Sequence, residues 1–130
     1  MTPERLFTPQ QAVRTLPLVR KIIADVMATG RELKALAKSR QPPDVLDAEA
    51  QRLTARLEKL IGEFGEIGCF YKDWNFDIGL VDFPAVIAGK KVLLCWRSDE
   101  PGITHYHGFD EGFAQRREIP AEWLREECHR

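Results

Sequence analysis

The sequence predicts an α+β fold, in which a long antiparallel helical hairpin over residues 8–66 is followed by a small, mostly antiparallel β-sheet over residues 67–130. Apolar residues in the first half recur in alternating steps of four and three, which is the spacing of a helical seam. Beyond Gly68 the pattern changes to alternation and to runs rich in β-branched residues, as in strands. At 130 residues, the chain is long enough for one domain, residues 1–130, with its own core.

The first helix is predicted to start at Thr8, which can cap it, with Pro9 at the first helical position and Gln11 reaching back to the cap. Pro17 removes a backbone donor, so we expect a kink there or a helix that restarts. Gly30 lies on the seam, where it either admits a close neighbour or is simply tolerated. The seam comprises Ala12, Leu16, Val19, Ile23, Val26, Gly30, Leu33 and Ala37.

The second helix follows the segment SRQPPD, whose paired prolines end the first helix, and Asp44 is expected to cap it. Its seam comprises Leu46, Ala50, Leu53, Leu57, Leu60 and Phe64. A helix over residues 8–39 is roughly 48 Å long, so the hairpin has more apolar stripe than its two helices cover. We therefore expect a homo-oligomer that forms through the helices. The alternative is that the C-terminal half of the chain folds back over the stripe.

Four segments after Gly68 are predicted strands: CFYKDW, IGLVDFPAVIAG, KKVLLCWR and GITHYHGF. A turn at Ala88-Gly89 is expected to join the second to the third, and the short segment around Pro101 to return the chain as another hairpin. The last segment, IPAEWLREECHR, is expected to form a turn or short helix that docks through Trp123 and Leu124.

Charge and composition restrict the partners and the location that we expect for this protein. Nineteen basic and twenty acidic residues give a formal charge of -1, which disfavours nucleic acid as a partner, since proteins that bind it usually show a basic excess. No apolar run approaches the roughly 18 residues that cross a membrane, and the N-terminus lacks a signal-peptide pattern. Three cysteines without close pairing favour reduced thiols. We therefore expect a cytoplasmic protein that does not bind membranes.

Two histidines spaced by one residue form a candidate metal site. His105 and His107 share one face of a predicted strand, and Glu100 lies close in sequence, so these three side chains can ligate one ion. Imidazole with carboxylate suits Zn, Fe, Mn or Ni. The alternative is that both histidines hydrogen-bond neighbouring backbone groups.

A polar pocket is also predicted where the strands meet. Hairpin pairing of the strands brings distant polar side chains together, and an Arg with two carboxylates is costly to bury unpaired. Asp82 is expected to pair with Arg97 or Arg116, while Cys95 is most simply a buried structural thiol. A structural polar network under the sheet is the competing interpretation. The predicted pocket residues are Asp82, Arg97, Glu100, His107 and Arg116.

The order of several motifs resembles an uncharacterised bacterial family, the domain-of-unknown-function family numbered twenty-two-oh-three. The motifs are the opening FTPQQAVRTLPLVR, then GLVDFPAVIAGKKVLLCW, then Glu100, Ile103 and His107, and finally GFAQR. The resemblance covers nearly the whole chain and implies a long helical region followed by a short sheet. Where the family usually has Trp this chain has Tyr106, and His105 replaces a tyrosine-like residue, so a metal site common to the family would rest on His107. The resemblance implies no activity.

Two functions remain open from the sequence. The first is a small self-associating binding or scaffold protein with a polar pocket on its sheet, for a ligand that the sequence does not define. The alternative is a metal-binding protein or a metal-dependent enzyme centred on His107, with Zn or Fe as the metal. Whether the protein is an enzyme stays open.

Overall fold

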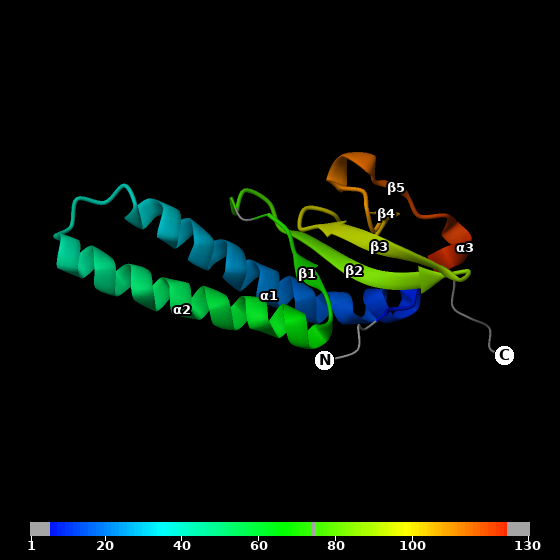
Figure 1. Cartoon of the computed structure of the whole chain (residues 1–130), viewed down its shortest axis with the longest axis horizontal. Helices are drawn as coiled ribbons and strands as arrows, with labels where there is room; N and C mark the ends of the chain where they lie inside the picture. The colour runs from blue at the N-terminus through cyan, green and yellow to red at the C-terminus, as the bar shows by residue number, and fades with distance from the viewer. Residues whose placement is uncertain (1–5, 74, 125–130) are drawn as a thin grey trace.

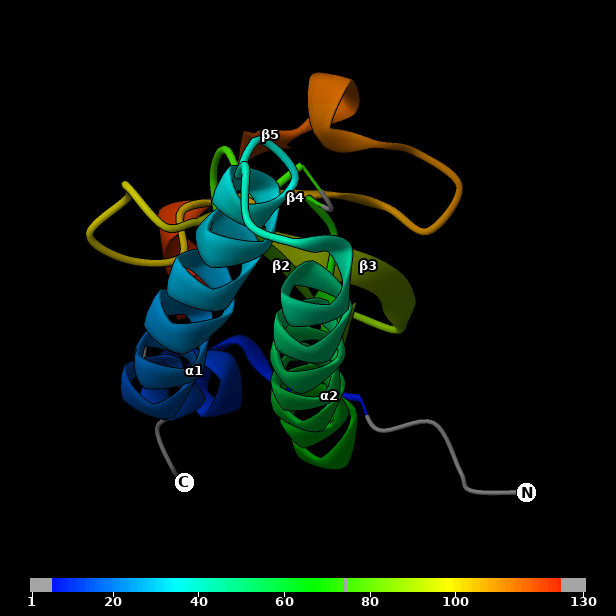
Figure 2. The ribbon, with the colours of Figure 1, turned by 90° about the vertical axis from the view of Figure 1, so that its left-hand side faces the viewer.

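A computed structural model describes residues 6–73 and 75–124, and it has the predicted α+β architecture (Figure 1). Helices α1 (Pro9–Leu36) and α2 (Pro43–Ile67) form the antiparallel hairpin, whose connecting end extends beyond the sheet. Figure 2 shows the two helices side by side, viewed from that connecting end. In the described part of the chain, no helix has both the length and the hydropathy that crossing a membrane requires.

The ends of the helices follow from local sequence. Thr8 caps α1 as predicted, since its Oγ1 accepts from the Gln11 N–H at 3.1 Å and the Gln11 side chain accepts from the Thr8 N–H at 3.0 Å. The helix runs through Pro17 without restarting. The predicted Asp44 cap is wrong: Pro42 occupies the cap position, and Asp44 lies in the first turn of α2, where its charge favours the helix dipole.

The sheet contains five antiparallel strands in sequence order. Ala88 and Gly89, with φ of 53° and 80°, form the tight turn predicted between the second and third strands. The two-residue fifth strand and the 3-10 helix η1 (Phe113–Gln115) were not expected from the sequence. The strands are β1 (Phe70–Tyr71), β2 (Leu80–Ile87), β3 (Lys90–Arg97), β4 (His105–Gly108) and β5 (Arg117–Glu118).

Successive side chains along each strand point to opposite faces of the sheet, so the two faces carry different residues. The inner face packs with α1 and the end of α2 in one hydrophobic core and includes Val81, Phe83, Ala85, Val92, Leu94 and Trp96. The outer face carries Asp82, Cys95 and His107. Short helix α3 (Ala121–Leu124) follows β5, and its Trp123 ring lies 5.0 Å from the Tyr106 ring. The Leu124 side chain and residues 125–130, including Cys128, lie outside the described residues.

Gly30 admits a close neighbour, which was one of the two interpretations of this glycine. The Phe76 ring, from the β1–β2 connection, lies where a Cβ on residue 30 would be. The same connection contacts α1 a turn later, where Lys34 Nζ donates to the Asn75 carbonyl oxygen at 2.8 Å.

We predict that Gly30→Ala lowers the free energy of unfolding by about 1–3 kcal/mol, because the added methyl group overpacks the contact with Phe76. Gly62→Ala is the matched control, since it is also helical and has open space at its Cβ position. That control should raise stability by up to about 1 kcal/mol through helix propensity. Urea denaturation measures both, and equal effects of the two changes would contradict the packing role of Gly30.

Candidate functional site

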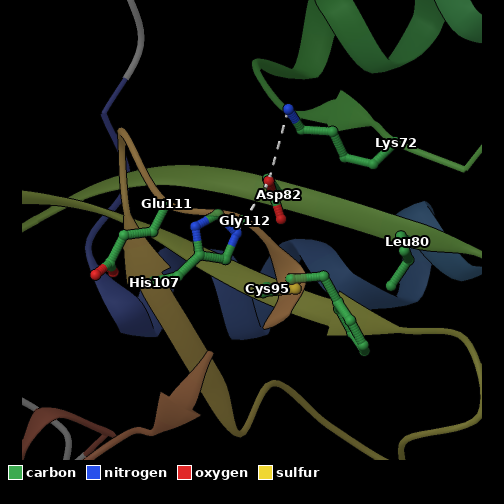
Figure 3. A pocket seen from close by; sticks show the side chains of 8 residues that line it. Lys72, Leu80, Asp82, Cys95, His107, Glu111 and Gly112 are labelled. Carbon is green, nitrogen blue, oxygen red and sulfur yellow. Dashed lines mark ion pairs between the residues drawn. The ribbon is translucent and has the colours of Figure 1, made fainter. Parts of the chain in front are cut away.

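A cavity of about 230 Å³ opens on the outer face of the sheet, opposite the face that packs on α1 (Figure 3). Strand residues form its base, and the segment that follows β4 contributes part of its wall. Both polar and apolar side chains surround it. The lining residues are Lys72, Leu80, Asp82, Cys95, His107, Glu111, Gly112 and Phe113.

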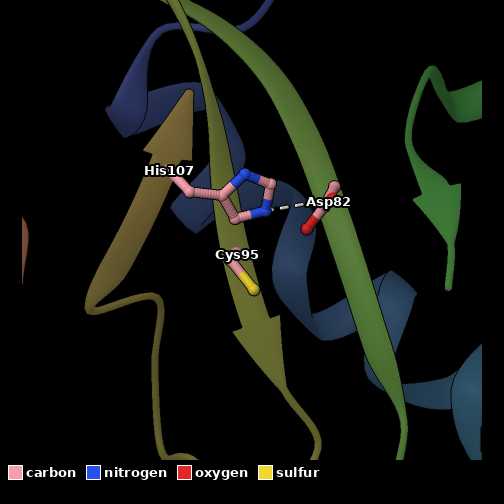
Figure 4. A group of neighbouring side chains, drawn as sticks. All are labelled: Asp82, Cys95 and His107. Atoms are coloured by element: carbon pink, nitrogen blue, oxygen red, sulfur yellow. Dashed lines mark ion pairs between the residues drawn. The ribbon is translucent and has the colours of Figure 1, made fainter. Parts of the chain in front are cut away.

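Three buried polar side chains converge at the base of this cavity from three adjacent strands (Figure 4). Asp82 on β2 lies directly opposite Cys95 on β3, while His107 on β4 lies opposite Leu93 and so diagonal to Cys95. Each of the three side chains belongs to a residue that is no more than 3% exposed. One ligand atom from each, an imidazole nitrogen, a thiol sulfur and a carboxylate oxygen, lies within 4.8 Å of the other two.

The imidazole of His107 has a defined orientation. Its Nδ1 lies 2.9 Å from the Gly108 carbonyl oxygen, which can only accept, so Nδ1 carries a proton. Its Nε2 faces Asp82 Oδ2 at 3.4 Å. With Nδ1 protonated, a neutral imidazole presents its lone pair at Nε2, toward the carboxylate. A cation between these two atoms would turn the close approach of two acceptors into an attraction for both.

Burial has the largest effect on the pKa values of Asp82 and Cys95. It raises the pKa of the Asp82 carboxyl above its ordinary value, although the charges of His107 and Lys72 and a hydrogen bond from the Cys95 thiol act in the opposite direction. Burial and the Asp82 charge raise the pKa of the Cys95 thiol from 9.0 to about 12. The protein without a bound cation therefore keeps Cys95 as a thiol, and this group is a poor nucleophile.

Two charged residues lie at the mouth of the cavity. Lys72 Nζ is 3.9 Å from Asp82 Oδ2, and the Lys72 side chain is half-exposed. Glu111 accepts from the Gly108 N–H at 2.7 Å and pairs with Arg117 at 2.9 Å, and these contacts lower its pKa. Figure 3 shows Lys72 reaching toward Asp82, whereas Glu111 points away from His107.

A second polar cluster, formed by Glu100, His105 and Arg116, adjoins the first and is not part of the cavity wall. Arg116 Nη2 donates to Glu100 Oε1 at 2.9 Å and to the Cys95 carbonyl oxygen at 3.0 Å. His105 Nδ1 lies 3.7 Å from Glu100 Oε2 and 2.8 Å from Thr104 Oγ1. The Arg116 contacts tie the segment after β4 to strand β3.

The predicted pocket residues thus divide between these two clusters. Asp82 and His107 come together at the cavity, whereas Glu100 and Arg116 pair beside it, and Arg97 pairs with Asp99 at 2.7 Å. The expected pairing of Asp82 with Arg97 or Arg116 is wrong, because its charged neighbours are His107 and Lys72.

Lys72 was not among the site residues predicted from the sequence. The signal for it was the pairing of the predicted strand CFYKDW with the strand that carries Asp82. In that pairing Phe70 lies opposite Asp82, and Lys72 follows two residues later.

The fold and the site define an α+β protein whose sheet carries a buried histidine–carboxylate–thiol cluster beside a cavity. The chain belongs to the family described as Uncharacterized conserved protein (DUF2203), whose model matches residues 5–119, so the family predicted from the motifs is confirmed. No curated protein and no solved structure matches the chain.

The raised pKa of Cys95 predicts a loss of stability at alkaline pH. Between pH 9 and about 12 the folded protein keeps this proton while the unfolded chain loses it, so unfolding becomes more favourable as pH rises. The slope from one such group is at most about 1.4 kcal/mol per pH unit. We expect Cys95→Ser, which still donates to Asp82 but does not ionise, to reduce this slope. Denaturation at a series of pH values measures it, and identical slopes in the two proteins would contradict the prediction.

Proposed function

We propose that the protein binds a transition metal ion, with Zn²⁺ preferred, through Asp82, Cys95 and His107. Imidazole, thiolate and carboxylate are the ligands that zinc takes in proteins. The mixed set disfavours Mg²⁺ and Ca²⁺, which prefer oxygen ligands throughout. This proposal retains His107 as the centre and replaces His105 and Glu100 as its partners, because those two side chains interact with Thr104 and Arg116.

The observation that carries the proposal is the spacing and orientation of the His107–Asp82 pair. Two ligand atoms each about 2.05 Å from a tetrahedral zinc are roughly 3.3 Å apart, and His107 Nε2 and Asp82 Oδ2 are 3.4 Å apart. The hydrogen bond from Nδ1–H to the Gly108 carbonyl oxygen turns the Nε2 lone pair toward this position. Metal-binding histidines commonly have such a backbone or carboxylate partner on the second nitrogen.

The presence of three protein ligands favours a catalytic metal site over a purely structural one. Structural zinc sites usually have four protein ligands, whereas catalytic zinc has three and leaves a position for water or substrate. Only three ligating side chains converge within the described part of the chain, and the cavity adjoins them. We therefore infer that the fourth coordination position faces the cavity, as in a metal-dependent enzyme.

We predict that protein purified without a polyhistidine tag binds about one Zn²⁺ per chain, as measured by elemental analysis after dialysis. Asp82→Asn, Cys95→Ser and His107→Gln should each weaken binding by at least about tenfold, because each removes a ligand or its charge. His105→Gln and Glu100→Gln are matched controls from the adjoining cluster and should retain the metal. Circular dichroism confirms folding of each variant. Zinc retained by all three ligand variants would overturn the proposal.

A second candidate is the self-associating binding protein expected from the helical seams. Beyond Gly30, α1 has no fully buried residue, and its seam residue Leu33 is only partly covered, as is Leu46 of α2. Val45 on the same part of the hairpin is 45% exposed. These side chains favour a homo-oligomer that forms through the part of the hairpin beyond the sheet. The near-zero net charge and the free Cys95 thiol support a cytoplasmic protein that does not act on nucleic acid.

For this second candidate we predict at least a dimeric mass by light scattering at micromolar concentration. Val45→Asp should shift the mass toward the monomer, because burying an unpaired charge in an interface costs several kcal/mol. The substitution leaves the monomer fold intact, since Val45 is exposed within one chain. A monomeric mass for the unmodified protein at high concentration would exclude self-association.

A further inference from the structure

We propose that the metal-loaded site binds a small organic carboxylate, with one carboxylate oxygen on the metal and the other near the Lys72 ammonium group. This inference rests on the proposed metal site and adds the chemical class of its ligand. It follows from the charges around the cavity, the position of Lys72 and the size and lining of the cavity.

The charge balance of the loaded site favours an anion. A divalent metal would be neutralised by the Asp82 carboxylate and the Cys95 thiolate, while His107 binds as a neutral ligand. Lys72 then leaves one net positive charge at the mouth of the cavity. Glu111 does not cancel it, because its carboxylate already pairs with Arg117 and the Gly108 N–H. A monoanionic ligand would complete the balance.

Lys72 is placed to contact such a ligand. Its Nζ lies 3.9 Å from Asp82 Oδ2, so it is close to the metal ligands. Once Asp82 donates to a metal, its interaction with Lys72 weakens, and the ammonium group can take a new anionic partner. The half-exposed side chain has the freedom to follow a ligand that enters from solvent.

The apolar side of the cavity indicates an organic anion. Leu80 and Phe113 line the cavity beside the polar groups. The centre of the Phe113 ring lies 5.7 Å from the Arg97 guanidinium group and 4.7 Å from that of Arg116. The volume of about 230 Å³ exceeds that of an engineered protein cavity of roughly 150 Å³ that binds benzene, so it is enough for a short-chain carboxylate.

The test uses the full-length protein loaded with Co²⁺ in place of Zn²⁺, because cobalt bound to thiolate has visible absorption bands that respond to its ligands. Propionate is titrated into the loaded protein, and propionamide serves as a neutral probe of the same shape. The proteins compared are the unmodified chain, Lys72→Met and the control Lys90→Met, which removes an exposed lysine at the β2–β3 turn. Circular dichroism checks the fold of each.

We expect propionate to shift the cobalt bands to saturation and propionamide to leave them unchanged. Lys72→Met should weaken propionate binding by roughly fivefold, the scale of a partly exposed ion pair, while Lys90→Met should not. Three results would overturn this inference without contradicting the metal site: no change of the cobalt bands with propionate, an equal change with propionamide, or equal propionate binding by Lys72→Met. Absence of cobalt binding to the unmodified chain would overturn both.

Discussion

The structure depends on the register between strands β2 and β3. The Ala88–Gly89 turn fixes Leu80 opposite Arg97 and Ile87 opposite Lys90 over two strands of equal length. Because side chains alternate between faces, this register directs one set of residues toward α1 and the other toward the outer face. A shift of β2 by one residue would turn Phe83 out of the core and Asp82 into it. The same shift of β3 would exchange Leu94 and Cys95.

The buried polar cluster has a cost that the fold must offset. Asp82 and His107 are 2% and 3% exposed, and burying ionisable groups is unfavourable unless they are paired. Their partners come from short segments around the sheet, including Lys72 near the end of β1 and the Gly108 carbonyl oxygen at the end of β4. Apolar residues at these positions would stabilise the sheet more simply. The cluster is therefore easier to explain by ligand binding than by stability.

Much of the fold could be predicted from the sequence, because the patterns that indicate its helices and turns are local. The Thr8 cap, the helical seams and the Ala88–Gly89 turn each depend on a few neighbouring residues. The proximity of Asp82 and His107 also followed, since it needs only two successive hairpins.

The partners of the charged residues could not be predicted in the same way. Arg97 pairs with Asp99 rather than with Asp82, and Arg116 reaches Glu100 from the segment beyond β4, whose path is set by η1 and the two-residue β5. The two-residue β5 has too little pattern to be recognised, and a long arginine side chain can reach several carboxylates. Lys72 was missed for a different reason: the strand CFYKDW was predicted, but its pairing with the strand of Asp82 was not.

The arrangement separates the helices from the candidate site. All three proposed ligands belong to β2, β3 and β4, and α1 packs against the opposite face of these strands. Metal binding would therefore add direct links among three strands and, through His107 and Gly108, to the segment that forms the cavity wall. The part of the hairpin beyond the sheet contributes none of the proposed ligands, so self-association there would leave the cavity accessible. Binding at the sheet and assembly through the helices are thus compatible in one molecule, and substitutions that affect one should leave the other nearly unchanged.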